Sequence, residues 1–289
     1  LELADVEPHD MSQFYRAPEF DKYFTRGEML PALKKTLTSM GIDLEKQKNI
    51  HIDLEERPHK VGSLYIGIKV PEDIRLVVMP LGGYRGYAHL FHEIGHALHC
   101  ASTDPNLDFE YRWLSSISLS EGYAYLFGNL VMDEVWLRRY LGMRETKSFL
   151  EFQYLAYKLM ALREWGAGLS YELQLHSKGP DGMDDVYEEI SKRVYKLKVD
   201  KNNYLIEDHW LDSADILRAH FFEAQLRDAL RERFGEEWFE NPKAGQFLRE
   251  LWSMGGKYDV EGVVKVLGYE GLDPKYMIDE IRAYYTDLR

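Results

Sequence analysis

The residues best suited to chemistry lie in the segment LFHEIGHALH, where Glu93 stands between His92 and His96. Histidines four residues apart lie on one face of a helix, one turn apart, so their rings can hold one cation from the same side. The carboxylate of Glu93 can then reach a water on that cation without binding the cation itself. This pattern predicts a zinc site in which Glu93 takes a proton from the attacking water. The alternative is a surface helix with two solvated histidines.

A catalytic zinc ion needs three protein ligands and one further position for water or substrate. We expect Glu121, in SLSEGYAYLF, to be the third ligand, because it opens a second apolar helical segment with 24 residues between it and His96. Such a connection lets the second helix return beside the first. The rivals are His99, one turn beyond the site, Glu110, in an expected loop, and Glu134, a full helix length away.

These motifs resemble the thimet oligopeptidase and oligopeptidase F family of zinc peptidases. The segment HEIGHALH with Glu121 at that interval carries the likeness, and IHIDLEERPHKVGSLYIGI and LWSMGGKYDVEGVVKVLG are similar to the stretches before the zinc helix and near the end of the family's chains. The resemblance implies a zincin-like (gluzincin) catalytic domain, one Zn²⁺ ion and peptide substrates. It also implies a further helical region upstream, which agrees with the missing initiator Met.

The sequence departs from the family's pattern at the hydrogen-bond donors that stabilise the tetrahedral oxyanion. His209 lies where the family has a catalytic histidine, but Asp215–Ala219 occupies the place of its tyrosines. Because loss of one such donor typically costs about 10²–10³ in rate, another group is expected to serve. Tyr204 and Arg218, which we also expect to contact substrate, and His220 are the substitutes. The alternative for each of these three residues is a purely structural role.

The elements that must position these residues follow from periodicity. Isoleucine- and valine-rich runs between Pro and Gly predict three strands of one small sheet, at Ile50–Leu54, Ser63–Lys69 and Ile74–Met79. Apolar residues at three- and four-residue spacing predict helices elsewhere. These lie at Glu28–Met40, Tyr87–Cys100, Ser116–Leu141, Ser148–Trp165, Met183–Leu197, Ala214–Phe234, Ala244–Met254 and Pro274–Asp287. The predicted fold is mainly α with one small β-sheet.

We expect residues 1–289 to form a single catalytic domain, the C-terminal part of a longer chain. Within it, residues 1–86 supply a helix and the sheet, 87–141 the zinc-site helices, and 142–289 a helical C-terminal region. A net charge of −13 disfavours nucleic acid and anionic lipid as partners. The single cysteine, Cys100, excludes an internal disulfide, and we expect a cytoplasmic protein without membrane spans.

The function expected from these features is hydrolysis of peptide bonds in short peptides by zinc-assisted attack of water. A peptide would extend along an exposed sheet edge near Leu76–Met79. The alternative is a non-catalytic scaffold in which zinc is structural or peptides are only bound. The absent tyrosines favour that alternative, whereas Glu93 opposes it, because a structural zinc has no use for a base beside its ligands.

Overall fold

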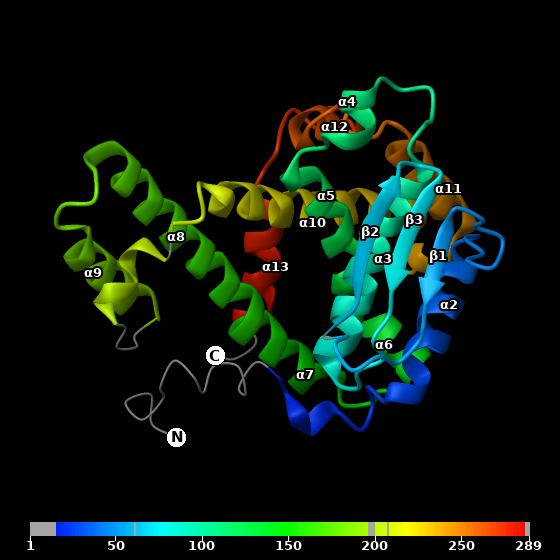
Figure 1. Ribbon diagram of the computed structural model, residues 1–289. Coiled ribbons are helices and arrows are strands. Elements are labelled where there is room, and N and C mark those ends of the chain that lie inside the picture. Colours follow the sequence, from blue (N-terminus) through cyan, green and yellow to red (C-terminus); the bar gives the residue numbers. More distant parts are fainter. Residues whose placement is uncertain (1–15, 61, 196–199, 207, 287–289) are drawn as a thin grey trace.

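The computed structural model describes residues 16–60, 62–195, 200–206 and 208–286 of the 289-residue chain. Within these residues the protein is mainly helical with one three-stranded sheet (Figure 1). The predicted fold class is therefore confirmed. The last residues of the helices predicted at Met183–Leu197 and Pro274–Asp287 lie outside the described residues.

Most of the predicted helices are present. The longer ones are α2 (Met29–Ser39), α3 (Tyr84–Ser102), α5 (Ile117–Gly128), α6 (Glu134–Leu141), α8 (Leu159–Lys178), α9 (Met183–Tyr195), α10 (Asp212–Phe234), α11 (Pro242–Ser253) and α13 (Lys275–Thr286). Short helices α4 (Phe109–Trp113), α7 (Thr146–Phe152) and α12 (Val260–Val266) complete the set. A helix of five residues, such as α4, is too short to produce a readable apolar period, and it had been expected as a loop.

The sheet consists of β1 (Ile50–Asp53), β2 (Leu64–Lys69) and β3 (Asp73–Val77) in the order β1-β3-β2. The central strand β3 runs parallel to β1 and antiparallel to β2. Leu76 is paired on both sides, so the expectation of an exposed edge at this strand was wrong. The isoleucine- and valine-rich runs located the strands, but they carry no information on which strand becomes central. The edge that faces α3 belongs to β2.

Helix α3 begins at Tyr84, three residues before the predicted start, and covers one face of the sheet (Figure 1). Most of its apolar residues are buried, among them Leu90, Phe91 and Ile94, which are fully buried. The opposite face of α3 carries the histidines. The sheet and the core thus fix the rotation of this helix, and with it the direction of the histidine side chains.

The segment predicted as one helix at Ser116–Leu141 is broken in two. After α5 a 3₁₀ turn covers Asn129–Met132, and Asp133 then caps α6 by accepting hydrogen bonds from the backbone N–H groups of Val135 and Trp136, both 3.0 Å away. An aspartate in extended conformation at this position is a strong helix start signal. The apolar period continues across the break, which is why periodicity alone missed it.

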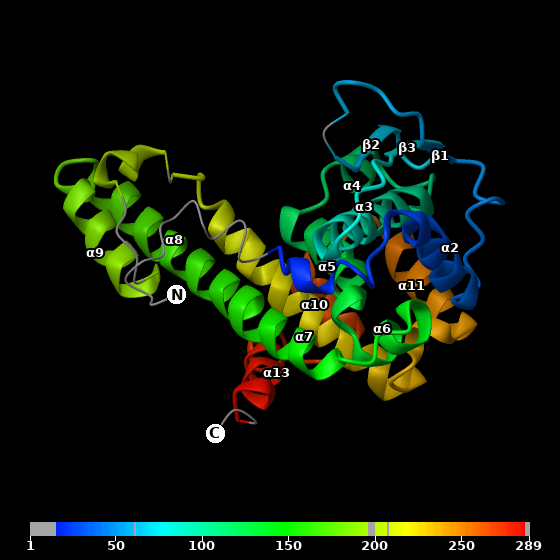
Figure 2. The ribbon, with the colours of Figure 1, turned by 90° about the horizontal axis from the view of Figure 1, so that it is seen from below.

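The helix predicted at Ser148–Trp165 is instead a longer, composite element. Helix α7 passes through a π-helical segment, Gln153–Lys158, into α8, which runs on to Lys178. Helices α8 and α9 and the 3₁₀ turn Lys201–Leu205 form a helical arm (residues 159–195 and 200–206) that projects from the rest of the molecule (Figure 2). The arm has a small apolar core of its own, made of Ala167, Tyr171, Leu175, Met183, Tyr187 and Ile190.

Candidate metal centre

The close approach of α3 to α5 creates the site. A Cβ atom on Gly95 of α3 would lie 2.7 Å from the Cα of Ala124 and 2.8 Å from the carbonyl oxygen of Tyr123, both on α5. Only a glycine therefore allows the two backbones to touch here. This contact brings Glu121 of α5 opposite the histidine face of α3.

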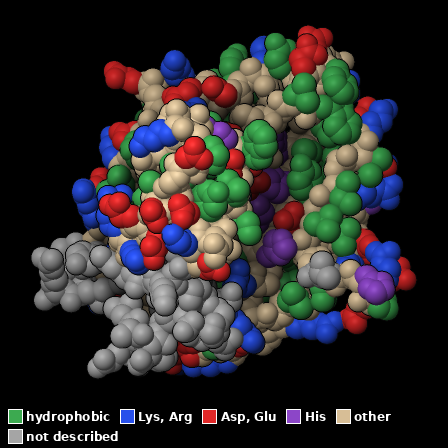
Figure 3. Space-filling view, turned by 60° about the vertical axis from the view of Figure 1, so that its left-hand side comes forward, with side chains coloured by type: hydrophobic (Ala, Val, Ile, Leu, Met, Phe, Trp, Pro, Cys, Tyr) green, Lys and Arg blue, Asp and Glu red, His purple; other side chains and the backbone are tan. Residues whose placement is uncertain are grey.

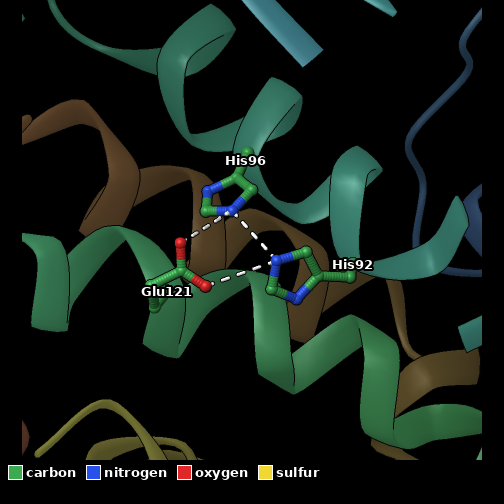
Figure 4. A group of neighbouring side chains, drawn as sticks. All are labelled: His92, His96 and Glu121. Atoms are coloured by element: carbon green, nitrogen blue, oxygen red, sulfur yellow. Dashed lines mark hydrogen bonds and ion pairs between the residues drawn. The ribbon is translucent and has the colours of Figure 1, made fainter. Parts of the chain in front are cut away.

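His92, His96 and Glu121 point toward one another (Figure 4). The Nε2 atoms of the two histidines are 3.1 Å apart, and they lie 3.3 and 3.4 Å from the two carboxylate oxygens of Glu121. Ligand atoms about 2.0–2.1 Å from a tetrahedral zinc ion are separated from one another by about 3.3 Å. The donor types and their spacing therefore fit one zinc ion.

Neighbouring side chains hold the two histidine rings in place. The Nδ1 atom of His96 lies 2.9 Å from the hydroxyl of Ser120, which leaves Nε2 for the metal. Tyr65 of β2 stacks on His96 with ring centroids 4.8 Å apart, and Tyr125 packs against His92 at 5.1 Å. These contacts fix the orientation of both rings.

Electrostatics keep Glu121 ionised. Burial raises the pKa of this carboxyl group, but hydrogen bonding and charge from His92 and His96 outweigh burial and lower the pKa to about 2. A carboxylate supplies both a bond and a negative charge to a cation. Glu121 is therefore an anion throughout the neutral range, as a carboxylate that binds zinc must be.

Glu93 lies beside the ligands, and partners on two sides hold its carboxylate. One oxygen accepts a hydrogen bond of 2.9 Å from the backbone N–H of Tyr65, on the free edge of β2. The other lies 3.1 Å from Nε2 of His89, one turn earlier on α3. Burial opposes its ionisation, but His89 and the Tyr65 amide lower the pKa of Glu93 below its usual value. Glu93 is thus a carboxylate able to accept a proton.

The structure does not bring the rival ligands into this group. His99 is buried against the ring of Tyr123, with centroids 4.9 Å apart, and burial lowers its pKa to about 4. Glu110 is exposed on α4. Glu134 accepts hydrogen bonds from Thr146 and from Arg138 on α6. Among the described residues, the group with ligand geometry is the one predicted.

The residues predicted to stabilise the oxyanion have other contacts. The backbone N–H of His209 donates to Glu172 over 2.8 Å, and the carbonyl of Tyr204 accepts a 2.6 Å hydrogen bond within the arm. Arg218 forms an ion pair of 3.3 Å with Glu261. The role predicted for each therefore stays a prediction. His220, the remaining substitute, stacks on Tyr125 at 4.2 Å.

Sequence reasoning missed Tyr65, Tyr125 and His89. A signal existed for two of them, since Tyr125 lies four residues after Glu121 and His89 four residues before Glu93. That spacing places each on the same helix face as its partner. No such signal exists for Tyr65, which reaches the site only because β2 is an edge strand beside α3.

A cavity of about 420 Å³ adjoins the site, and its lining includes both His92 and Tyr125. It extends from the ligands toward the first turn of α3, where Arg85 lines it. Figure 3 shows histidine side chains along the floor of a hollow in the surface, with hydrophobic side chains on both sides. The ligand group is thus reachable from solvent through a defined space.

The fold has relatives among solved structures, although no protein-family model and no curated protein matches the chain. The M32 carboxypeptidase from Deinococcus radiodurans R1 aligns with a TM-score of 0.68 and 16% identity over 92% of this chain and 60% of that one. The Pyrococcus furiosus carboxypeptidase aligns with a TM-score of 0.63 and 14% identity over 98% of this chain and 68% of that one. Trypanosoma cruzi metallocarboxypeptidase 1 aligns with a TM-score of 0.61 and 14% identity over 97% of this chain and 67% of that one. The protein has the fold of these carboxypeptidases.

The alignment confirms the zincin-like fold but goes no further, because an identity of 14–16% shows the fold alone. The resemblance to the thimet oligopeptidase and oligopeptidase F family in particular stays a prediction. This chain spans between 60% and 68% of the lengths of the three aligned structures. Within the described residues, no helix is both long and apolar enough to cross a membrane.

Proposed function

We propose that the protein is a zinc-dependent peptidase that hydrolyses peptide bonds in short peptides. The observation that carries the proposal is the spacing of 3.1–3.4 Å among the ligand atoms of His92, His96 and Glu121, directly beside the ionised Glu93. The carboxypeptidase fold supports it.

In this proposal each residue has a definite role. His92, His96 and Glu121 would hold the zinc ion, with Ser120 fixing the ring of His96. When bound, zinc supplies a Lewis acid that lowers the pKa of a water and polarises a carbonyl. Glu93 would take the proton from the attacking water and hold it for the leaving amine.

The free edge of β2 is the surface on which we expect the peptide backbone to lie. Tyr65 is on this edge, and its N–H already donates outward to Glu93 rather than to another strand. An extended peptide can add to such an edge through backbone hydrogen bonds. Leu64, Ile66 and Ile68 are partly exposed along the same strand and could pack against apolar side chains of a substrate.

A non-catalytic scaffold is the competing function, and Glu93 argues against it. Two contacts hold its carboxylate next to the ligands, where a purely structural zinc would not need a proton acceptor.

X-ray absorption at the zinc edge, combined with hydrolysis of a mixed quenched-peptide library, tests the proposal. We expect one zinc ion per chain with two histidines, one carboxylate and a water as ligands, together with zinc-dependent hydrolysis. Four protein ligands and no hydrolysis would support the scaffold instead.

A further inference from the structure

The cavity beside His92 has a chemical character that the proposed function does not explain. We propose that it binds a carboxylate group of the substrate and that Arg85 is the residue that recognises it. The inference rests on the proposed peptidase function only for the position of the bond that is cut.

Arg85 shares a face of α3 with His89 and His92, at intervals of four and three residues. With a rise of about 1.5 Å per residue, the backbone of Arg85 lies about 10 Å along the helix from that of His92. An extended peptide covers this distance in about three residues. A carboxylate bound by Arg85 would therefore belong to a substrate residue within about three positions of the scissile bond.

The lining of the cavity is unusual for a chain with a net charge of −13, because the described residues that form it include no aspartate or glutamate. Arg85 supplies a full positive charge, and no carboxylate of the described residues lies within 4.0 Å of its guanidinium. Other arginines, such as Arg139, Arg227 and Arg231, are ion-paired with acidic residues of the chain. Within the described part of the chain, the guanidinium of Arg85 therefore has no acidic partner and can pair with an external anion.

A second donor lines the same cavity. The side-chain Nδ2 of Asn129, at the end of α5, is buried and has no hydrogen-bond partner among the described residues. Burial of an amide donor without a partner is unfavourable, so a ligand that accepts from it gains affinity. A carboxylate has two oxygens and can accept hydrogen bonds from more than one donor.

Two tyrosines define the walls near Arg85. Tyr84 and Tyr157 both line the cavity, and the positive charge of Arg85 counteracts the rise that burial causes in the pKa of each hydroxyl. Arg85 lines the cavity as an exposed residue, so its guanidinium is open to solvent while its charge reaches these two hydroxyl groups. Aromatic walls with a charged end suit the terminal part of a peptide that carries both an apolar side chain and a carboxylate.

The carboxylate has two sources in a peptide, the C-terminus and the side chain of Asp or Glu. Three peptides separate them: Ala-Ala-Ala-Phe with a free C-terminus, its C-terminal amide, and Ala-Ala-Ala-Glu as the amide. Their dissociation constants are measured by calorimetry on the zinc-loaded Glu93→Gln protein, which does not consume them under the proposed mechanism. The same measurements are repeated after adding Arg85→Met, Arg85→Lys or, as a control, Arg249→Met, which removes a charge from α11 outside the cavity.

We expect Arg85→Met to weaken binding of a carboxylate peptide by about 10–100-fold, the range of a charge-assisted hydrogen bond, and to leave the Phe amide within twofold. Arg85→Lys should retain part of the affinity, and Arg249→Met all of it. Loss with the free-acid peptide assigns the site to a C-terminus, and loss with the Glu amide assigns it to a side chain.

Equal affinity of all three peptides for the Arg85→Met variant and for its parent would overturn the inference. The outcomes that would contradict the peptidase proposal are different ones. If the protein binds no zinc but still distinguishes acid from amide through Arg85, the carboxylate site stands and the peptidase does not. If zinc-dependent hydrolysis occurs without any effect of Arg85 on these affinities, the reverse holds.

Discussion

Glu93 and Glu121 are both partly buried carboxylates beside the same two histidines, yet they are held by different partners. Both oxygens of Glu121 face the Nε2 atoms of His92 and His96. Glu93 instead faces the Tyr65 amide and His89. Under the proposed function, this difference in contacts corresponds to one carboxylate for the metal and one for the proton, and two substitutions test the two roles separately.

Replacing Glu93 by Gln should preserve zinc content and reduce kcat by at least about 10²-fold, because the amide cannot take a proton but leaves the ligand atoms untouched. Zinc stoichiometry and hydrolysis of a quenched peptide are measured on the same preparation. Turnover within tenfold of the parent would show that another group is the base.

Replacing Glu121 by Ala should release the metal, since two histidines alone bind zinc weakly. Zinc is quantified after dialysis against a mild chelator. Glu110→Ala is the matched control, because this glutamate is exposed on α4 and should not affect occupancy. Equal zinc retention in both variants would remove Glu121 from the ligand set.

At the scale of elements, a helix or strand can be predicted when the sequence pattern that indicates it lies within the element itself. The three strands and α3 were predicted within a few residues, because their apolar periods are local. The strand order, the break at Asp133 and the long α8 were not. Each of these three features depends on which other element packs against the segment. A short stretch of sequence does not contain that information.

The contact between α3 and α5 at Gly95 determines where Glu121 lies relative to His92 and His96. Gly95→Ala would place a methyl group 2.7 Å from the Cα of Ala124, so α3 and α5 must separate and carry Glu121 away from the histidines. We expect lower thermal stability, by about 1–3 kcal/mol, and weaker zinc binding.

Gly166→Ala is the control for this prediction, because nothing lies within 4 Å of a Cβ atom at that position of α8. Alanine there should leave zinc affinity unchanged and stability equal or slightly higher. If Gly95→Ala behaved like Gly166→Ala in denaturation and zinc titration, the close helix contact would not hold the site together.

At the scale of the whole molecule, the ligands could be predicted but their surroundings could not. The pair His92 and His96 follows from spacing within one helix, and Glu121 from the length of the connection to the next. Tyr65, in contrast, reaches the site from the sheet, and Arg85 lines the adjoining cavity. Of the positions predicted for the oxyanion donors, Tyr204 lies in the helical arm and His209 contacts it, and the length and separate core of this arm were not foreseen. A site whose residues come from one pair of helices can be predicted from a sequence. The side chains that other elements contribute to the surroundings of that site cannot.

Buried neutral histidines should make the metal-free fold sensitive to acid. Burial lowers the pKa of His99 and of His220 to about 4, below the value of 6.5 of an exposed histidine. As the pH falls from 6.5 toward 4, the unfolded chain takes up these protons and the folded chain does not, so stability is lost. Each histidine should contribute about 1.4 kcal/mol per pH unit within that window.

Urea unfolding of the metal-free protein at pH 7.0, 6.0 and 5.0 measures this slope. His99→Phe removes one titrating group and should flatten the slope, whereas His59→Phe, at an exposed loop position, should not. An unchanged slope in His99→Phe would mean that this ring is protonated in the folded state as readily as in the unfolded one.

The most direct test of the central claim is a zinc titration of the chelated, metal-free protein in which peptide hydrolysis is followed at each addition. If His92, His96 and Glu121 hold one catalytic zinc ion, hydrolysis should be absent at the start, rise in proportion to added zinc and level off at one equivalent per chain, with Glu93→Gln binding the same equivalent without hydrolysis. Hydrolysis that persists after chelation, or a full equivalent of bound zinc without hydrolysis of any peptide in the library, would contradict it.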